Sequence, residues 1–218
     1  MSLQCPLCRH RAVQPYHRDK FRSYHQCDNC ALVFVPPKFH LSPDEEKAYY
    51  DLHENSIEDE GYRQFLSRCA QPLLKELKGS CCYGLDFGCG PAPLLARILE
   101  GNGHRVDLYD HFYAPAQKAL HGNYDFIVAT EVIEHLGQPG AEIENLWGRL
   151  RTGGVMALMT KLVISAERFA NWHYIRDPTH ICFFSVKTFE WLARSLGAEL
   201  QFVHSDVIFL RKLSIDPE

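Results

Sequence analysis

The spacing of apolar residues changes along the chain, from a helical period to short strand-like runs. Between residues 44 and 78, apolar side chains recur at three- and four-residue steps, which places them on one face of a helix. That face consists of Leu66, Cys69, Ala70, Leu73, Leu74 and Leu77. Short apolar runs then predict strands at 82–87 and 105–110, with a helical run at 94–100 between them. The order strand, helix, strand predicts an α/β fold.

The last third of the chain continues this alternation. A helix is predicted at 186–196, followed by two strands at 199–204 and 206–211. The preceding segment, residues 171–180, is polar, aromatic and interrupted by proline, which predicts a loop. It follows a strand, so we expect it at the carboxyl edge of the sheet, where open α/β sheets bind ligands.

Charge changes sign near the Pro36-Pro37 pair. Residues 1–40 contain six Lys/Arg and two acidic residues, whereas residues 41–60 contain eight acidic residues and Lys47 as their only Lys or Arg. We therefore predict a small module at 1–40 and a main domain at 41–218. The net charge of −4 argues against nucleic acid as the main partner.

Two C-x-x-C pairs lie within the small module. Cys5 and Cys8 form the first pair, Cys27 and Cys30 form the second, and 18 residues separate Cys8 from Cys27. Two such pairs supply the four tetrahedral thiolate ligands that structural zinc prefers. A segment of this length cannot build a sufficient core alone, so a metal cross-link is physically needed. We predict a structural Zn²⁺ with all four cysteines as ligands.

The nine cysteines also bear on the compartment. An odd number, with several thiols among apolar neighbours, argues against a disulfide framework and for a reducing environment. The first residues lack the basic start and apolar stretch of a signal peptide, and no run approaches the ~18 apolar residues of a membrane span. We expect a cytoplasmic protein that makes no membrane contact.

A glycine-rich turn follows the strand at 82–87. Gly88 and Gly90 stand between this strand and the next helical run, where a backbone can approach a ligand closely. Asp86 ends the strand before the glycines, and Asp110 ends the following strand, where an acid can accept hydrogen bonds from ribose hydroxyls. These features alone are also compatible with a dinucleotide-binding enzyme.

Three motifs in order carry a family resemblance. Leu85-Asp-Phe-Gly-Cys-Gly-Pro-Ala92 resembles the first motif of class I S-adenosylmethionine-dependent methyltransferases. The segments at 124–136 and 150–160 are similar to their fourth strand and to the glycine turn before their fifth strand. The resemblance implies a Rossmann-like methyltransferase sheet with helices on both faces and a C-terminal antiparallel hairpin. A dinucleotide enzyme would not be expected to carry the last two motifs.

The resemblance also implies roles for individual residues. Gly88 and Gly90 would pass against the methionine part of S-adenosylmethionine, and Asp86 would organise the turn or hold the cofactor's amino group. Asp110 would take the ribose hydroxyls, and Thr130 and Glu131 would line the pocket near the sulfonium.

One segment departs from the family pattern. Only the 13 residues from His111 to Asn123 separate Asp110 from Tyr124, where the family places a helix, a third strand and an adenine-contacting acid. A helix and a strand together need about 15 or more residues. We therefore expect the third, edge strand to be absent or rudimentary, with the adenine held by other groups.

Candidate groups for chemistry lie in two places. Glu131, Glu134 and His135 share one face if this segment is helical, and they are candidate ligands for a divalent ion that would assist a substrate hydroxyl. The segment around His180 is similar to a signature of this methyltransferase group, so His180 is the first candidate for a substrate-orienting residue or general base. His135 is the second, because an imidazole with a pKa of about 6.5 can accept a hydroxyl proton at neutral pH.

These features predict a methyltransferase that acts on a small molecule at oxygen or carbon. The paired knuckles before such a domain also resemble sugar C-methyltransferases. One alternative is an RNA methyltransferase that uses the zinc module for RNA contact, since some ribosomal RNA guanine methyltransferases begin with a similar module. The other is a cofactor-binding protein without catalysis, which the shortened segment after Asp110 favours.

Overall fold

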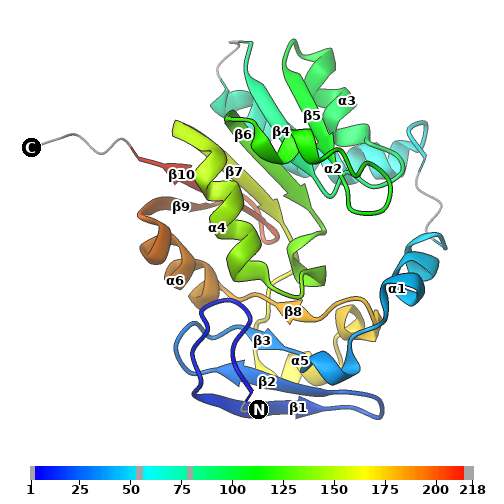
Figure 1. Ribbon diagram of the computed structural model, residues 1–218, viewed down its shortest axis with the longest axis vertical. Helices are drawn as coiled ribbons and strands as arrows, with labels where there is room; N and C mark the ends of the chain where they lie inside the picture. Colours follow the sequence, from blue (N-terminus) through cyan, green and yellow to red (C-terminus); the bar gives the residue numbers. More distant parts are fainter. Residues whose placement is uncertain (1–2, 53–55, 78–80, 214–218) are drawn as a thin grey trace, which may run out of the picture.

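The computed structural model describes residues 3–52, 56–77 and 81–213, and within them the chain forms two sheets (Figure 1). The large sheet has the spatial order β5 (Arg105–Tyr109), β4 (Tyr83–Phe87), β6 (Tyr124–Thr130), β7 (Leu150–Met159), β10 (Val207–Lys212), β9 (Ala198–Phe202). The small sheet has the order β1 (Val13–Arg18), β2 (Ser23–Cys27), β3 (Val33–Phe34), β8 (Cys182–Phe183). The small sheet lies at the lower end of Figure 1, below the large one.

Five strands of the large sheet run in one direction, and β10 runs in the opposite direction. Strands β5, β4, β6 and β7 are parallel, whereas β10 runs antiparallel to both β7 and β9. The C-terminal antiparallel hairpin expected from the sequence is thus confirmed, and the carboxyl ends of four parallel strands meet at one edge. Ligands of open α/β sheets bind at this edge.

Alternate side chains of the large sheet pack against helices on opposite faces. Phe126 and Val128 of β6 belong to the core that α2 (Glu60–Glu76) and α3 (Leu94–Gly101) cover. The intervening Ile127 and Ala129 point into the core that includes residues of α4 (Pro139–Arg149) and α6 (Val186–Leu196). A strand segment buried on both faces needs apolar residues at successive positions, which explains the unbroken apolar run Phe126–Ala129 within β6.

The third strand of the usual methyltransferase sheet is absent from the described part of the chain. A short 3₁₀ helix, η2 (Gln117–His121), occupies the connection between β5 and β6 instead. The Tyr124 hydroxyl closes this connection by donating a hydrogen bond to the carbonyl oxygen of Ala119 (2.5 Å). The expectation of a reduced edge strand is confirmed, and β5 becomes the edge of the sheet.

The single helix predicted over 44–78 was wrong in its extent. The structure has two helices, α1 (Pro43–Tyr50) and α2, and each begins at its own capping residue. Ser42 and Glu45 form a reciprocal capping box at α1, and the Asp59 carboxylate accepts hydrogen bonds from the first amides of α2. Residues 53–55 and 78, which also fall in the predicted helix, lie outside the described residues.

The first 40 residues pack onto the rest of the chain through several elements. β3 pairs with β8, so the small sheet takes its last strand from residues 182–183. The Tyr24 ring lies edge-on to Phe169 of α5 (Ala166–Ala170) and to Phe183. A 3₁₀ helix, η1 (Pro37–Phe39), leads from this sheet to α1. The boundary at residue 40 stays a prediction, since one apolar core includes residues on both sides of it.

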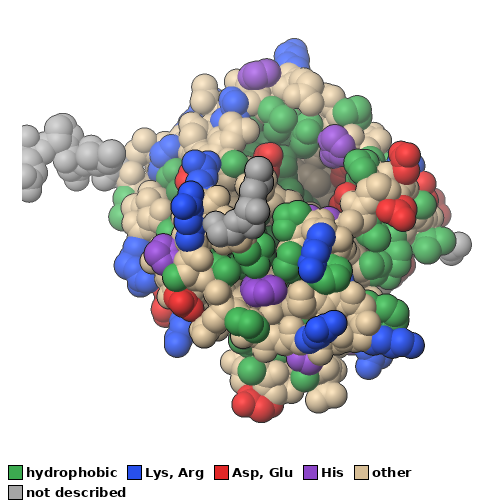
Figure 2. Space-filling model, turned by 60° about the horizontal axis from the view of Figure 1, so that its bottom comes forward, with side chains coloured by type: hydrophobic (Ala, Val, Ile, Leu, Met, Phe, Trp, Pro, Cys, Tyr) green, Lys and Arg blue, Asp and Glu red, His purple; other side chains and the backbone are tan. Residues whose placement is uncertain are grey.

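Surface charge is mixed on the face that Figure 2 turns forward. Lysine and arginine side chains stand there in several separate places among apolar and polar surface, and they form no continuous patch. Within the described residues, the helices are all too short or too polar to cross a membrane.

The contact between the first cysteine knuckle and α4 yields a prediction. A Cβ atom at Gly140 would lie 2.1 Å from the carbonyl oxygen of Leu7, so Gly140→Ala must push the knuckle away from the helix. We expect a loss of about 1–3 kcal/mol in the free energy of unfolding, measured by urea denaturation. Gly148→Ala on the same helix is the matched control, because a Cβ there meets nothing within 4 Å and alanine favours helix. Equal stability of the two variants would contradict the close packing.

Candidate active site

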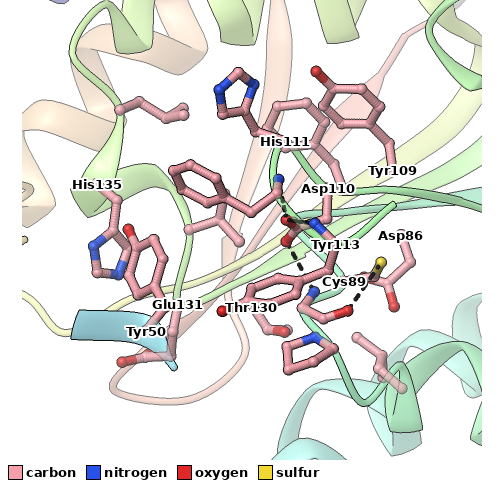
Figure 3. Close-up of a pocket in the computed structure, with 18 of the residues that line it drawn as sticks. Tyr50, Asp86, Cys89, Tyr109, Asp110, His111, Tyr113, Thr130, Glu131 and His135 are labelled. Carbon is pink, nitrogen blue, oxygen red and sulfur yellow. Dashed lines mark hydrogen bonds between the residues drawn. The ribbon is translucent and has the colours of Figure 1, made fainter. Parts of the chain in front are cut away.

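A cavity of about 670 Å³ opens at the carboxyl ends of β4, β5 and β6 (Figure 3). The Gly88–Gly90 turn and Asp110 line one part of it, and Tyr50 of α1, His135 and His180 line another. In Figure 3, His135 and Tyr50 lie together at one side, across from Cys89, Asp110 and Tyr113. The glycine turn and the two histidines thus face one shared cavity.

The backbone of the glycine turn adopts a conformation that residues with a side chain rarely adopt. Gly88 has a φ of +76°, and a Cβ atom there would lie 2.4 Å from a methyl carbon of Val132. The amides of Gly88 and Cys89 both donate to the carbonyl oxygen of Tyr109, at 2.7 and 3.2 Å, which fixes the turn against the end of β5. Gly90, also left-handed with a φ of +62°, has open space where its side chain would be. The turn thus exposes backbone to the cavity.

Asp110 connects the two strand ends that frame the turn. One carboxylate oxygen accepts a hydrogen bond from the Gly90 amide (3.0 Å), and the other accepts from the amides of Phe112 (2.8 Å) and Tyr113 (3.0 Å). The residue expected to bind ribose therefore also holds the glycine turn in place.

Asp86 lies beneath the same turn and is almost completely buried, with 3% of its surface exposed. Removal from water raises the pKa of its carboxyl group to about 7. A buried acid that lines a cavity is suited to receive a cationic group from a ligand.

The segment after β6 differs from the predicted helical face. Glu131 has a left-handed backbone with a φ of +53°, and only a short 3₁₀ helix, η3 (Ile133–His135), follows it. The α-helical spacing of Glu131, Glu134 and His135 was therefore wrong, because the chain turns sharply at Glu131. A non-glycine residue in this region costs about 1–2 kcal/mol, and such strain is typical of functional sites.

Two neighbouring acidic side chains differ in their exposure: Glu131 is half-buried and lines the cavity, whereas Glu134 is not among the residues that line it. Glu134 is fully buried, and Tyr174 of η4 (His173–Arg176) donates a hydrogen bond to its carboxylate. The Tyr174 hydroxyl also lies 3.3 Å from the Glu131 carboxylate. Burial is the main cause that raises the pKa of Glu131 to about 7 and that of Glu134 to about 8. One oxygen of each carboxylate is buried without a hydrogen-bond partner.

His180 and His135 are both held by the backbone of residues 173–181, which we call the substrate loop. His180 Nδ1 donates to the carbonyl oxygen of Tyr174 (2.8 Å), and His135 Nδ1 donates to that of Thr179 (3.2 Å). Because a carbonyl only accepts, each bond places the ring proton on Nδ1 and the lone pair of the neutral ring on Nε2. Burial lowers the pKa of His180, which keeps it neutral at physiological pH.

The structure brings together part of the expected divalent site and adds another residue. Ligand atoms of Glu134, His135 and His180 lie within 4.8 Å of one another, and Glu131 is not in this group. Glu131 and Thr130 line the cavity as expected. Tyr174 lies in the polar, aromatic segment 171–180 that the sequence predicts to be a ligand-binding loop, whereas His173 and Arg176 of the same segment are exposed.

The four cysteines of the N-terminal module also converge. Their sulfur atoms all lie within 4.8 Å of one another, with Cys5 and Cys30 at 3.5 Å and Cys8 and Cys27 at 3.4 Å. The hydrogen bond shared by the Cys5 and Cys30 sulfur atoms lowers the pKa of Cys5. The cluster thus favours a thiolate in this pair.

The sheet and the site at its edge together define a class of protein. An open α/β sheet with a left-handed glycine turn after β4 and a carboxylate after β5 is a Rossmann-like, nucleoside-binding arrangement. Residues 54–202 match the family described as a methyltransferase domain, which is more than half of the chain. The protein belongs to this methyltransferase-domain family.

Solved structures show the same fold at low sequence identity. The 1,6-didemethyltoxoflavin-N1-methyltransferase of Burkholderia thailandensis, with bound 1,6-didemethyltoxoflavin and S-adenosylhomocysteine, is 17% identical with a TM-score of 0.54, over 92% of this chain and 100% of that chain. The plantazolicin methyltransferase in complex with S-adenosylhomocysteine is 15% identical with a TM-score of 0.52, over 81% and 93%. Magnesium protoporphyrin IX methyltransferase of Synechocystis PCC 6803, with bound S-adenosylmethionine, is 13% identical with a TM-score of 0.51, over 80% and 93%. The Rossmann-like methyltransferase fold is confirmed.

No curated protein matches the sequence.

Replacing Glu134 with glutamine tests the burial of its carboxyl group. The pKa of Glu134 is raised to about 8 in the folded protein, whereas an unfolded chain ionises glutamate near a pKa of about 4.3. Between these values the folded state holds the extra proton, so wild-type stability falls as pH rises. In this interval, we expect the free energy of unfolding of Glu134→Gln to rise relative to that of the wild type by up to about 1.4 kcal/mol per pH unit, measured by urea unfolding.

The control for this prediction is Glu144→Gln, which changes an exposed side chain of α4. It should leave the pH dependence of wild-type stability unaltered. A Glu134→Gln variant that follows the wild-type curve at every pH would contradict the raised pKa.

Proposed function

We propose that this protein is an S-adenosylmethionine-dependent methyltransferase that acts on a small molecule. The observation that carries the proposal is the glycine turn locked by Asp110, which opens to the cavity through Gly90. Structures of this fold hold S-adenosylmethionine or S-adenosylhomocysteine. A polar carboxylate beside exposed backbone suits a ligand with ribose and amino acid parts.

Each cofactor role follows the position of the residue in the cavity. Gly88 and Gly90 would contact the methionine part, and the buried Asp86 carboxyl would accept its ammonium group. Asp110 retains acceptor capacity for ribose hydroxyls. Thr130 and Glu131 would lie near the sulfonium, which carries the transferable methyl group.

His180 is the proposed general base, with His135 beside it. The two rings lie 4.7 Å apart between centroids, and both histidines line the cavity. In methyl transfer, the bond between the sulfonium sulfur and the methyl carbon breaks as the substrate atom bonds to that carbon. A substrate hydroxyl or carbon acid must also lose a proton. The Nε2 lone pair of His180 would take that proton, while the site supplies alignment.

The charge of the cavity favours a neutral or cationic substrate. Its lining contains the carboxyl groups of Glu46, Asp86, Asp110, Glu131 and Asp177, and no lysine or arginine among the described residues. A phosphate or a polynucleotide would be repelled, and the mixed surface of Figure 2 offers no basic track. Small-molecule methylation is therefore favoured over RNA methylation; a salt-sensitive RNA affinity would reverse this preference.

The four-cysteine cluster supports a structural zinc ion. A tetrahedral site with Zn–S bonds of about 2.3 Å has sulfur atoms about 3.8 Å apart, close to the 3.5 and 3.4 Å of the two shortest pairs. Four thiolates leave no position for substrate, so the metal would hold the two knuckles together.

A divalent ion near the substrate is a second cofactor candidate. The partnerless buried oxygen of Glu134 is the observation that favours it, together with the imidazoles of His135 and His180. The donor set fits a divalent cation, and such an ion would lower the pKa of a substrate hydroxyl. In that case Glu134, His135 and His180 would serve as metal ligands, and His180 would not act as the general base.

Cofactor binding is the first test. Calorimetric titration should give micromolar affinity for S-adenosylmethionine and S-adenosylhomocysteine. Asp110→Ala should weaken binding about 10- to 100-fold, because it removes a charged acceptor and releases Gly90. Asp107→Asn, on the strand that precedes Asp110, is the control, since its carboxylate accepts from the Tyr83 hydroxyl and does not line the cavity.

Absence of binding to folded wild-type protein would overturn the enzyme assignment. Binding without methylated product from any small-molecule fraction, with labelled cofactor, would favour the non-catalytic cofactor-binding protein.

Elemental analysis tests both metal candidates. We expect one zinc per chain, lost in a Cys27→Ser, Cys30→Ser double variant. A divalent ion bound at the cavity would raise the metal content to two, and Glu134→Gln with His180→Gln would return it to one. Metal-free wild-type protein that unfolds as it does after zinc is added would contradict the structural zinc.

A further inference from the structure

One buried arginine connects the N-terminal module to the substrate loop. Arg22 lies in the turn between β1 and β2, and only 8% of its surface is exposed. Its guanidinium group reaches residues more than 150 positions away along the chain. The basic charge counted in the sequence at this position is therefore inside the protein and not on a nucleic-acid-binding face.

All five N–H donors of the Arg22 side chain are used. The Nη1 atom donates to the carbonyl oxygens of Pro178 (2.9 Å) and His180 (3.0 Å). The Nη2 atom donates to those of Ile175 (2.6 Å) and Asp177 (2.9 Å). The Nε atom donates to the Tyr24 hydroxyl (3.2 Å).

The guanidinium group is itself held in place. Tyr24 donates to one carboxylate oxygen of Asp19 (2.6 Å), and the other accepts from the backbone amide of Arg22 (2.6 Å). Tyr24 also stacks under the guanidinium group, 5.5 Å from its ring centroid. Contacts within its own hairpin thus fix the position of the guanidinium group. The Asp19 carboxylate lies close enough to offset the buried positive charge of Arg22.

Two other carbonyls of the substrate loop hold the two histidines. Those of Ile175, Asp177, Pro178 and His180 accept from Arg22, whereas those of Tyr174 and Thr179 accept from the Nδ1 atoms of His180 and His135. The two sets are interleaved along one short stretch of backbone, and each carbonyl that holds a histidine is next to one that Arg22 holds. Rotation of any peptide plane that Arg22 holds would therefore move the acceptor of a histidine.

We infer that Arg22 is a positioning residue for the candidate active site: it orients the loop carbonyls that keep His180 and His135 protonated at Nδ1. This inference rests on the proposed function, in which the Nε2 atoms face the substrate. Lysine cannot replace it, because an ammonium group offers three donors from one point and cannot serve four carbonyls in a planar fork.

Imidazole ¹⁵N spectroscopy tests the inference on the full-length protein at neutral pH. The signals of His135 and His180 are assigned from His135→Gln and His180→Gln variants. In the wild type we expect a single Nδ1–H tautomer at both residues. In Arg22→Ala we expect loss of the single tautomer at His180 and His135, and its recovery when millimolar guanidinium, but not urea, is added.

Two further variants keep the test decisive. Arg22→Lys preserves the charge and decides the result if Arg22→Ala does not fold; it too should lose the single tautomer. Arg18→Ala, an exposed arginine of the same hairpin, should retain it. Unchanged tautomers in folded Arg22→Ala or Arg22→Lys would overturn the inference.

The affinity for S-adenosylmethionine separates this inference from the proposed function. Arg22 contacts none of the cofactor-binding residues, so Arg22→Lys should bind the cofactor within about twofold of the wild type, well below one tenfold step of 1.4 kcal/mol. If the wild type binds no cofactor, the proposed function fails, and the tautomer comparison still decides the role of Arg22. If the cofactor binds and the tautomers do not change, only the role of Arg22 is wrong.

Discussion

The pairing of β3 with β8 is the contact on which the arrangement of this molecule depends. Two short strands, Val33–Phe34 and Cys182–Phe183, join the cysteine knuckles to the substrate loop. The amide of Val35 extends the contact by donating to the carbonyl oxygen of Ile181 (2.9 Å). Every residue of this junction is buried, so the loop and the module order each other. The N-terminal segment therefore packs against the substrate loop and shares one apolar core with the rest of the chain.

Burial of acidic groups is the second constraint. Asp86, Glu131 and Glu134 lie near the ends of two neighbouring parallel strands, where the fold removes them from water and raises the pKa of each. Such groups cost stability unless a cation or a proton joins them. Such a loss of stability is typical of functional sites in natural proteins. The left-handed backbone of Glu131 lies at the same place, so electrostatic and conformational strain coincide.

The sequence predicts local features well and long-range contacts poorly. The glycine turn, Asp110 and the missing third strand follow from residues close together in the chain, and the structure agrees. The break between α1 and α2 is hidden because Asp59 is one acid among many in an acidic stretch. Arg22 is invisible for another reason: nothing near it in the sequence shows that its partners begin at Ile175. Burial of a charge across such a separation depends on tertiary packing, which composition and periodicity do not record.

Loss of the third strand leaves β5 as the sheet edge, and an unpaired edge invites association with another chain. Here the edge has only the five residues Arg105–Tyr109, and its sequence places a cation and an anion, Arg105 and Asp107, on the outermost strand. The opposite edge, β9, is as short and includes the exposed Glu199. Short, charged edges discourage intermolecular strand addition. The fold can therefore shorten its sheet without gaining a surface prone to aggregation.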